Sequence, residues 1–302
     1  MYLVSFLAII IGILLGLLGG GGSILTVPVL VYLADLPAKS AIVTSLIVVG
    51  STSIIATLSH ARKKHVCWKT GAIFGSAGMF GAFIGGRLTT YVPDALLLVL
   101  LGCVMLLASL SMVFRKNAPA KNMDTKECLE NTSFCPMELP IVAILLDGFF
   151  LGIITGLVGV GGGFLLVPAL THLASLPVHA AIGTSLFIIS LQSAAALLGH
   201  ANHLTIDIEL TAIVTCLAIA GSFIGAKLAH YLPAKILKRG FGFFVLFLGS
   251  GLLYKEINRT VIAQIETLIG DYQQFILGVT AVIMSTFLYR LWLWLHTKKS
   301  KI

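Results

Sequence analysis

Long apolar runs alternate with short polar segments along almost the whole chain. A helix needs about 20 apolar residues to cross a bilayer. Seven uninterrupted runs meet this length, at 39–60, 70–91, 95–114, 178–200, 210–231, 237–254 and 275–295. Two further apolar stretches, 2–34 and 141–174, each contain a glycine cluster followed by a proline. Because glycine and proline both weaken a helix interior, these two stretches predict broken helices.

Each broken stretch divides into pieces of about 12–17 residues, and the second piece has about half the length needed to cross a bilayer. We therefore interpret each stretch as a broken hairpin that enters and leaves the membrane by the same face, while a stretch that crosses the membrane fully stays the alternative. Lipid offers no hydrogen bonds to a turning backbone, so such a turn must be buried in protein or line a wet cavity.

The sequence repeats itself without a gap at a shift of 140 residues. Gly16–Gly22 aligns with Gly156–Gly162, and further matches are Val27-Pro28 with Val167-Pro168, Leu36-Pro37 with Leu176-Pro177, Thr44-Ser45-Leu46 with Thr184-Ser185-Leu186, and His60-Ala61 with His200-Ala201. The chain is therefore a tandem duplication. We divide it into a first transmembrane repeat (1–114), a linker (115–140), a second transmembrane repeat (141–254) and a C-terminal part (255–302) with an amphipathic segment and a final transmembrane helix.

The charges of equivalent loops indicate how the repeats are oriented. The loop after Ala61 is basic, whereas its repeat equivalent, 200–209, has no Lys or Arg and carries two carboxylates. Basic loops stay on the cytoplasmic side of a membrane, so the two loops are expected on opposite faces. This predicts two repeats of inverted topology, with the linker and the C-terminal tail in the cytoplasm.

Composition supports the same class of protein. Hydrophobic residues make up 58% of the chain and charged residues 11%, less than half the usual share of about 25%. This excludes a soluble enzyme and a DNA-binding domain. The net charge of +8 comes from cations in short loops, which is the positive-inside pattern and does not indicate a nucleic-acid partner. The chain is predicted to be an all-α polytopic integral membrane protein of the lipid bilayer, with a prokaryotic inner membrane as the expected location.

The glycine clusters are the strongest candidates for a binding site. The short helices after them, starting near Ser23 and Gly163, would point backbone N–H groups and the positive end of a dipole at the bilayer centre. Two such ends, brought in from opposite faces, would bind an anion without a charged side chain. The predicted substrate-binding residues are Gly19, Gly20, Gly21, Gly22, Ser23, Thr44, Ser45, Gly159, Gly161, Gly162, Gly163, Thr184, Ser185 and Gln192.

Each of these assignments has a structural alternative. Glycines four residues apart also permit close helix packing, and this is the favoured interpretation of Gly12/Gly16, Gly81/Gly85, Gly148/Gly152/Gly156 and Gly221/Gly225. The hydroxyls of the two Thr-Ser pairs either donate to an anion or bond back to their own helices. Gln192 lies in the middle of its run, where an amide normally faces a partner or a cavity. Its repeat equivalent is Thr52, so the site would not be symmetric.

Five other polar residues are candidates for the pathway or for coupling. Arg87 and Lys227 are repeat equivalents, which either draw anions toward the pathway or extend to the membrane interface. Asp147 interrupts an apolar stretch, where a carboxylate either carries protons or lies at the interface. His60 and His200 end equivalent helices, where each either caps its helix or relays protons. The two histidines are expected to be too far apart to share a metal. No metal and no cofactor is expected.

A family resemblance rests on the duplicated motif. Gly-Leu-Leu-Gly-Gly-Gly-Gly-Ser is followed by Val-Pro, Leu-Pro and Thr-Ser-Leu, with a second copy about 140 residues later. This pattern resembles the TauE/SafE family of sulfite exporters over nearly the whole chain outside the linker and the C-terminal extension. The resemblance implies transport of small sulfur-containing anions such as sulfite, sulfoacetate or related organosulfur compounds. Val160 in place of Gly20 and Gly163 in place of Ser23 leave the two half-sites unequal.

The predicted function is therefore transport of a small anion by alternating access, with one repeat rocking against the other and with protons as a candidate coupling ion. A passive anion channel and a membrane scaffold or assembly factor without transport are the alternatives. An enzyme is not expected, because the spans offer only Asp147 and no facing acid or base. The substrate, the direction of transport and the oligomeric state stay open at this stage.

Overall fold

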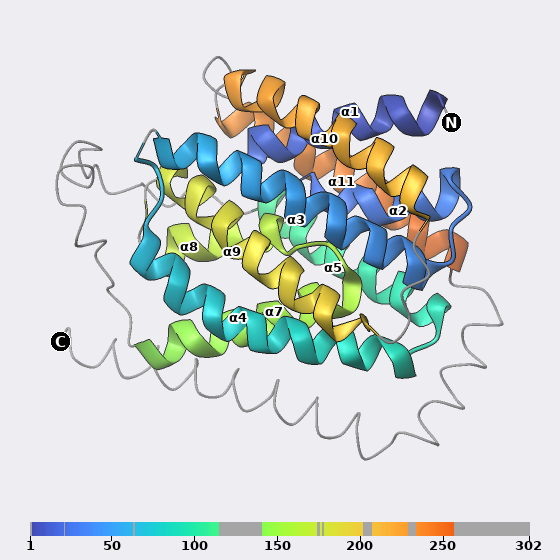
Figure 1. Ribbon diagram of the computed structural model, residues 1–302, viewed down its shortest axis with the longest axis horizontal. Coiled ribbons are helices and arrows are strands. Elements are labelled where there is room, and N and C mark those ends of the chain that lie inside the picture. The colour runs from blue at the N-terminus through green and yellow to red at the C-terminus, as the bar shows by residue number, and fades with distance from the viewer. Residues whose placement is uncertain are drawn as a thin grey trace. The chain divides into compact units, whose positions relative to one another are not determined.

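The structure is a computed structural model that describes residues 2–20, 22–62, 64–114, 141–173, 176, 178–201, 207–228 and 234–256. Within these ranges every regular element is helical (Figure 1). The elements are α1 (Tyr2–Leu18), α2 (Ser23–Leu33), α3 (Ala38–Arg62), α4 (Trp68–Leu88), the short 3₁₀ helix η1 (Thr89–Tyr91), α5 (Asp94–Phe114), α7 (Ile141–Val158), α8 (Gly163–Leu173), α9 (Val178–Gly199), α10 (Ile208–Leu228) and α11 (Ala234–Glu256).

The predicted breaks are confirmed at both glycine clusters. The first broken stretch forms α1 and α2, and the second forms α7 and α8, with α2 starting at Ser23 and α8 at Gly163. Six of the predicted uninterrupted runs are the helices α3, α4, α5, α9, α10 and α11. The linker 115–140, the amphipathic segment and the final run at 275–295 lie outside the described residues.

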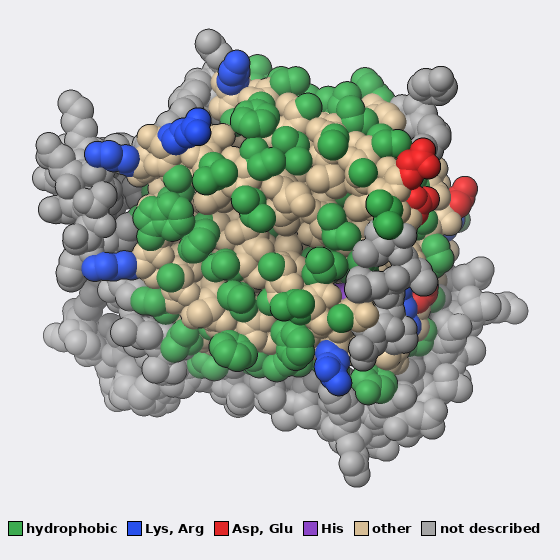
Figure 2. All heavy atoms as spheres, in the orientation of Figure 1, with side chains coloured by type: hydrophobic (Ala, Val, Ile, Leu, Met, Phe, Trp, Pro, Cys, Tyr) green, Lys and Arg blue, Asp and Glu red, His purple; other side chains and the backbone are tan. Residues whose placement is uncertain are grey.

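Several helices have the length and surface of membrane helices. In the described ranges, three are long and apolar enough to cross a membrane, namely Ala38–Arg62, Ala180–Gly199 and Ile208–Leu228. Large apolar side chains also face outward, for example Phe80 at 72% and Phe247 at 75% exposure. On the face in Figure 2, hydrophobic side chains cover the middle while Lys, Arg, Asp and Glu lie toward the margins. Such an apolar outer surface is suited to lipid and poorly suited to water.

Helices of each half of the chain pack mainly against helices of the other half. Helix α1 packs against α10 of the second half, and α7 packs against α4 of the first. The equivalent helices α3 and α9 pack against each other at the centre, α4 also lies against α9, and α10 against α3 (Figure 1). Because of this exchange, Met1–Tyr254 form one compact unit, and the halves share one core. Residues 255–302 form a second unit, of which only the end of α11 is described.

Glycines set the close approach of the exchanged helices. A side chain at Gly12 would collide with the backbone carbonyl of Ala218, and one at Gly16 with that of Ser222. In the other pair, Gly81 and Gly85 lie against the backbone of Phe149 and Ile153 in the same way. The interpretation of the regularly spaced glycines as packing residues is thus confirmed, and backbone contact of this kind is typical of membrane helices.

The same contacts give the direction of each helix. Residue numbers rise together along α1 and α10, and along α4 and α7, so each of these pairs is parallel. In contrast, α3 and α9 are antiparallel, because Gly50 meets Ser193 whereas Gly183 meets His60. The equivalent third helices of the two halves therefore run in opposite directions.

Candidate functional site

The glycine clusters form two tight turns with backbone angles that favour glycine. The φ angle is 64° at Gly19 and 106° at Gly20 in the first turn, and 71°, 67° and 65° at Gly159, Gly161 and Gly162 in the second. Residues with a Cβ avoid this left-handed region at a cost of about 1–2 kcal/mol. The glycines therefore give the turns a shape that other residues adopt only under strain. Gly21 lies outside the described residues.

The two turns meet each other at the centre of the core. A Cβ built on Gly20 would lie 2.7 Å from the Cα of Gly163, and one built on Gly163 would lie 2.5 Å from the Cα of Gly20. The backbones thus touch directly, which no other residue type would allow. The structure brings the predicted glycines of both halves into one place.

Each turn is also held by a serine from the opposite half. The hydroxyl of Ser45 donates a hydrogen bond of 2.8 Å to the carbonyl oxygen of Gly159. The equivalent Ser185 donates one of 2.8 Å to the carbonyl oxygen of Gly19. Both serines are 0% exposed. Their protons are bound by backbone carbonyls, so their position favours a role in holding the turns over donation to an anion.

The neighbouring threonines differ from the serines. Thr44 is buried, with no bond to the glycine turns among the hydrogen bonds described. Thr184 accepts a hydrogen bond of 2.9 Å from the backbone N–H of Cys67, at the start of α4. The predicted hydroxyl residues therefore have different partners. The two serines hold the glycine turns, and Thr184 connects α9 to the start of α4.

In the first turn, the serine hydroxyl forms its hydrogen bond within the turn itself. Ser23, the first residue of α2, donates a hydrogen bond of 2.6 Å to the carbonyl oxygen of Gly20. Gly22 precedes it as the residue that caps α2. In the second half the equivalent position is Gly163, which has no hydroxyl to close the turn.

The second turn faces polar side chains that lack partners in the described part of the chain. Gln192 is 0% exposed and Ser193 2% exposed, and neither the carboxamide nor the hydroxyl has a hydrogen bond there. A Cβ at Gly162 would lie 3.7 Å from Gln192 Oε1, and one at Gly161 would lie 3.8 Å from Ser193 Oγ. A buried polar group without a hydrogen bond costs about 1–3 kcal/mol, so a hydrogen bond from a ligand or water would stabilise these atoms.

Three buried hydroxyl residues on the helices α2, α3 and α7 were not predicted from the sequence. Thr26 and Ser53 are fully buried, and their hydroxyls have no hydrogen bond among the described residues. Thr155 lies against Gly162, and its hydroxyl donates 2.7 Å to the carbonyl of Leu151. The duplication contained one usable signal, because Ser53 is the repeat equivalent of Ser193.

The predicted pathway cations lie away from the glycine turns. Arg87 and Lys227 are exposed, each in the last turn of its helix. They are at opposite ends of the bundle, because α4 is parallel to α9 whereas α10 runs in the opposite direction (Figure 1). Arg87 is nine residues beyond Gly78, the residue of α4 that contacts Gln192, or about 13 Å along the helix.

The three titratable candidates are also separated from the turns. Asp147 is half-buried in α7, eight residues before Thr155. His60 lies beside Gly183 near the start of α9, while His200 follows the end of that helix and packs on Gly86. No group of three metal-ligating residues occurs in the part of the chain that the structure describes.

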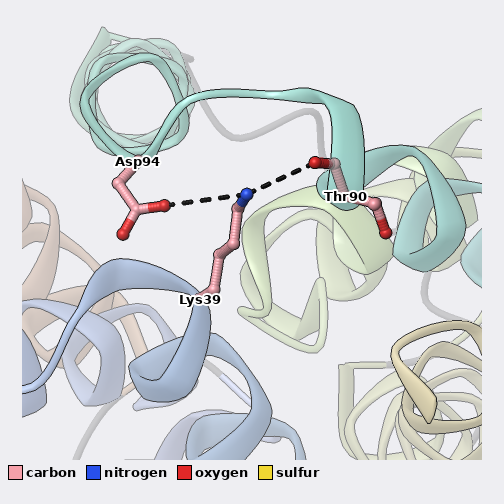
Figure 3. A network of polar contacts seen from close by, with 3 residues as sticks. All are labelled: Lys39, Thr90 and Asp94. Atoms are coloured by element: carbon pink, nitrogen blue, oxygen red, sulfur yellow. Dashed lines mark hydrogen bonds and ion pairs between the residues drawn. The ribbon is translucent and has the colours of Figure 1, made fainter. Parts of the chain in front are cut away.

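One polar contact outside the core connects two ends of the first half (Figure 3). The Lys39 ammonium donates a hydrogen bond of 3.3 Å to the carbonyl oxygen of Thr90. It also lies 4.0 Å from Asp94 Oδ1. Lys39 is the second residue of α3 and Asp94 the first of α5, so the pair connects the starts of these two helices. The equivalent positions in the second half are His179 and Ala234, which cannot form this ion pair.

A duplicated helical core with membrane-length helices and broken helices at its centre is typical of membrane transporters. The family described as "Sulfite exporter TauE/SafE" matches residues 4–252. The chain belongs to this family, which confirms the resemblance seen in the duplicated motif.

Two relatives support this assignment. A "Probable membrane transporter protein" of Xylella fastidiosa is 33% identical over 250 residues, which cover 82% of this chain and 92% of the relative. The "Probable membrane transporter protein YunE" of Bacillus subtilis is 29% identical over 270 residues, which cover 83% of this chain and 96% of the relative. No solved structure matches the chain.

Proposed function

We propose that this protein is a multi-pass transporter of a prokaryotic inner membrane that moves small anions, such as sulfite or organosulfur compounds, by alternating access. The observation that carries the proposal is the pair of touching glycine turns, each held by a serine of the opposite half, with an unpartnered carboxamide beside the second turn. Neutral donors at a buried backbone turn are the means by which helix N-termini bind anions.

Inverted repeats are part of this proposal. The opposite directions of α3 and α9 support them, and so do the charges at the helix ends. The exposed Arg62 ends α3 and the exposed Lys64 follows it, whereas the exposed Asp207 and Glu209 lie in the connection from α9 to the start of α10. Since α3 and α9 are antiparallel, the basic and the acidic groups lie at opposite ends, and the basic end is the cytoplasmic one by the positive-inside rule.

The contacts around the turns support re-entrant hairpins. A Cβ at Gly22 would lie 2.5 Å from the carbonyl oxygen of Ile11 and 2.6 Å from the backbone nitrogen of Leu15. The chain has therefore turned back along α1 where α2 begins. A helix that crossed the membrane through this point would continue away from Ile11.

The exchanged packing changes the expected motion. Glycine contacts join α1 to α10 and α7 to α4. The two sequence repeats therefore cannot move as separate bodies without breaking these contacts. We therefore propose that the moving bodies are the exchanged groups, α1 with α10 and α4 with α7. Arg87 and Lys227 would lie at the two mouths, and Asp147 remains a candidate for proton coupling.

Uptake of radiolabelled sulfite and thiosulfate into proteoliposomes tests the function, with the native chain compared with Gly161→Leu. Leucine at this position meets both the left-handed backbone and Val49 Cγ1, which is 2.7 Å from the Cβ position. Gly251→Leu is the matched control, because nothing lies within 4 Å of that Cβ position.

Saturable flux and exchange, lost in Gly161→Leu and kept in Gly251→Leu, are the expected results. Flux without saturation or exchange would instead indicate a passive channel. Absence of flux for all small anions tested in the native chain would favour a scaffold or assembly factor.

A further inference from the structure

The polar side chains beside the second turn suggest how the substrate is selected, an inference that rests on the proposed transport of small anions. Helix α8 has 11 residues, and its start is preceded by Gly161 and Gly162, which face Ser193 and Gln192. Both side chains are more than nine-tenths buried, and their polar atoms have no hydrogen bond within the described ranges. A helix N-terminus and unpartnered polar groups thus face the same point.

Packing holds the carboxamide of Gln192 in place. A Cβ at Gly78 of α4 would collide with Nε2 and would lie 2.9 Å from Cδ. On the other side, the Cβ position of Gly162 is 3.7 Å from Oε1. The amide group is therefore enclosed between α4 and the second turn, and the absence of a side chain at Gly78 provides its space.

A carboxamide has two N–H donors and one carbonyl acceptor. An oxyanion without protons can accept from Nε2, but it offers nothing to Oε1 and brings negative charge close to that oxygen. An oxyanion that keeps one acidic proton accepts from Nε2 and donates to Oε1, so both ends of the carboxamide are satisfied. In a buried site the difference in affinity between the two forms is large, because a polar group without a hydrogen bond there incurs its full desolvation penalty.

We propose that Gln192 is a specificity-determining residue that selects the singly protonated form of a small oxyanion, so that the proton crosses the membrane on the substrate. Ser193 and the N-terminus of α8 supply further donors to the anion. Transport is then coupled to protons without a titratable side chain at the binding site. Gly78 determines the space for the carboxamide and therefore belongs to the same recognition unit.

Titratable side chains of the surrounding helices are remote from this point. Measured from the residue of each helix that contacts the site, every described one is at least seven residues away, or about 10 Å along the helix. They are Lys69 and Arg87 on α4, Asp147 on α7, Lys39, His60 and Arg62 on α3, and His200 directly after α9.

The test is exchange of radiolabelled sulfite across proteoliposomes that contain the full chain, with equal pH on both sides. The pH series spans the second ionisation of sulfurous acid, which falls near neutral pH, and selenite provides a second substrate of the same kind. With equal pH no gradient drives the exchange, so KM reports recognition. Methanesulfonate, an anion with one charge and no acidic proton, is the competitor.

For the native chain, KM for total sulfite should rise about tenfold per pH unit above the ionisation, because only the protonated fraction binds. Methanesulfonate should compete weakly. Gln192→Met keeps the length of the side chain without its polar atoms. It should raise KM at low pH about tenfold or more and remove most of the pH dependence.

Gly78→Ala displaces the carboxamide without removing it and should change KM in the same direction. The control Gly251→Ala should keep the native pH profile. An unchanged pH profile in Gln192→Met, or a native KM that is flat across the series, would overturn the proposal. Lack of saturable exchange in the native chain at any pH would instead contradict the transport function itself.

Discussion

The two glycine turns have the same backbone design and different polar surroundings. In the first half, Ser23 donates to Gly20, and Thr52 donates 2.6 Å to the carbonyl of Val48 in its own helix. In the second half, the equivalents are Gly163, which has no side chain, and Gln192, whose carboxamide has no hydrogen bond in the described part of the chain. Duplication thus supplied the paired architecture, and divergence replaced a threonine bonded within its own helix by a carboxamide that has no hydrogen bond among the described residues.

The difference suggests a division of labour between the half-sites. We propose that the first turn, in which Ser23 bonds to Gly20, serves mainly as a backbone contact for the second. In this proposal, the carboxamide beside the second turn is the group that responds to a ligand. An asymmetric site of this kind can bind one small anion in a defined orientation, which a symmetric site could not impose.

The strongest test of the shared design changes one glycine in each turn. We expect Gly20→Ala and Gly161→Ala each to abolish transport, because a Cβ would be strained by about 1–2 kcal/mol and would also collide with Ile189 or Val49. Both variants should lower the melting temperature in detergent by similar amounts. A variant that keeps full transport would show that its turn is not under this constraint.

The comparison between halves is sharpened by two substitutions at equivalent positions. Gln192→Met should raise the KM for sulfite about tenfold or more, whereas Thr52→Val should change it less than about twofold, since that hydroxyl is satisfied within its own helix. Uptake kinetics at one pH measure both effects. Equal losses in the two variants would contradict an asymmetric site.

Removing the reciprocal serine bonds should affect stability more than recognition. Ser45→Ala and Ser185→Ala each leave a buried glycine carbonyl without its donor, at an expected cost of about 1–3 kcal/mol. Melting curves in detergent should show comparable destabilisation, with KM nearly unchanged for the protein that remains folded. A rise in KM without a change in melting temperature would instead assign these hydroxyls to the anion.

The smallest effect is expected at the ion pair that occurs in the first half only. Lys39 and Asp94 have side-chain exposures of 33% and 45%, so solvent screens most of their attraction. Asp94→Asn should cost no more than about 1 kcal/mol, and the loss should shrink further in high salt. Melting curves at low and high salt measure it, and a salt-independent loss would point to packing at the start of α5.

Much of the architecture could be predicted from the sequence because it depends on local composition and on the duplication. Apolar run lengths predicted the helices α3, α4, α5, α9, α10 and α11, and the glycine clusters predicted the helix starts at Ser23 and Gly163. The spacing of Gly12 with Gly16 and of Gly221 with Gly225 indicated helix packing, although nothing in that spacing showed that these glycines pack against each other's helices.

The tertiary structure decided which groups meet and which polar atoms are already used. Ser45 and Ser185 are hydroxyl residues at repeated positions in the sequence, and only the exchanged packing brings them to carbonyls 114 and 166 residues away. Gln192 could be chosen from its place in an apolar run, but the space at Gly78 and the two turns beside it come from three segments distant in sequence. Run length and periodicity are local properties of a chain, whereas the satisfaction of a buried polar group depends on neighbours that only the folded backbone brings within reach.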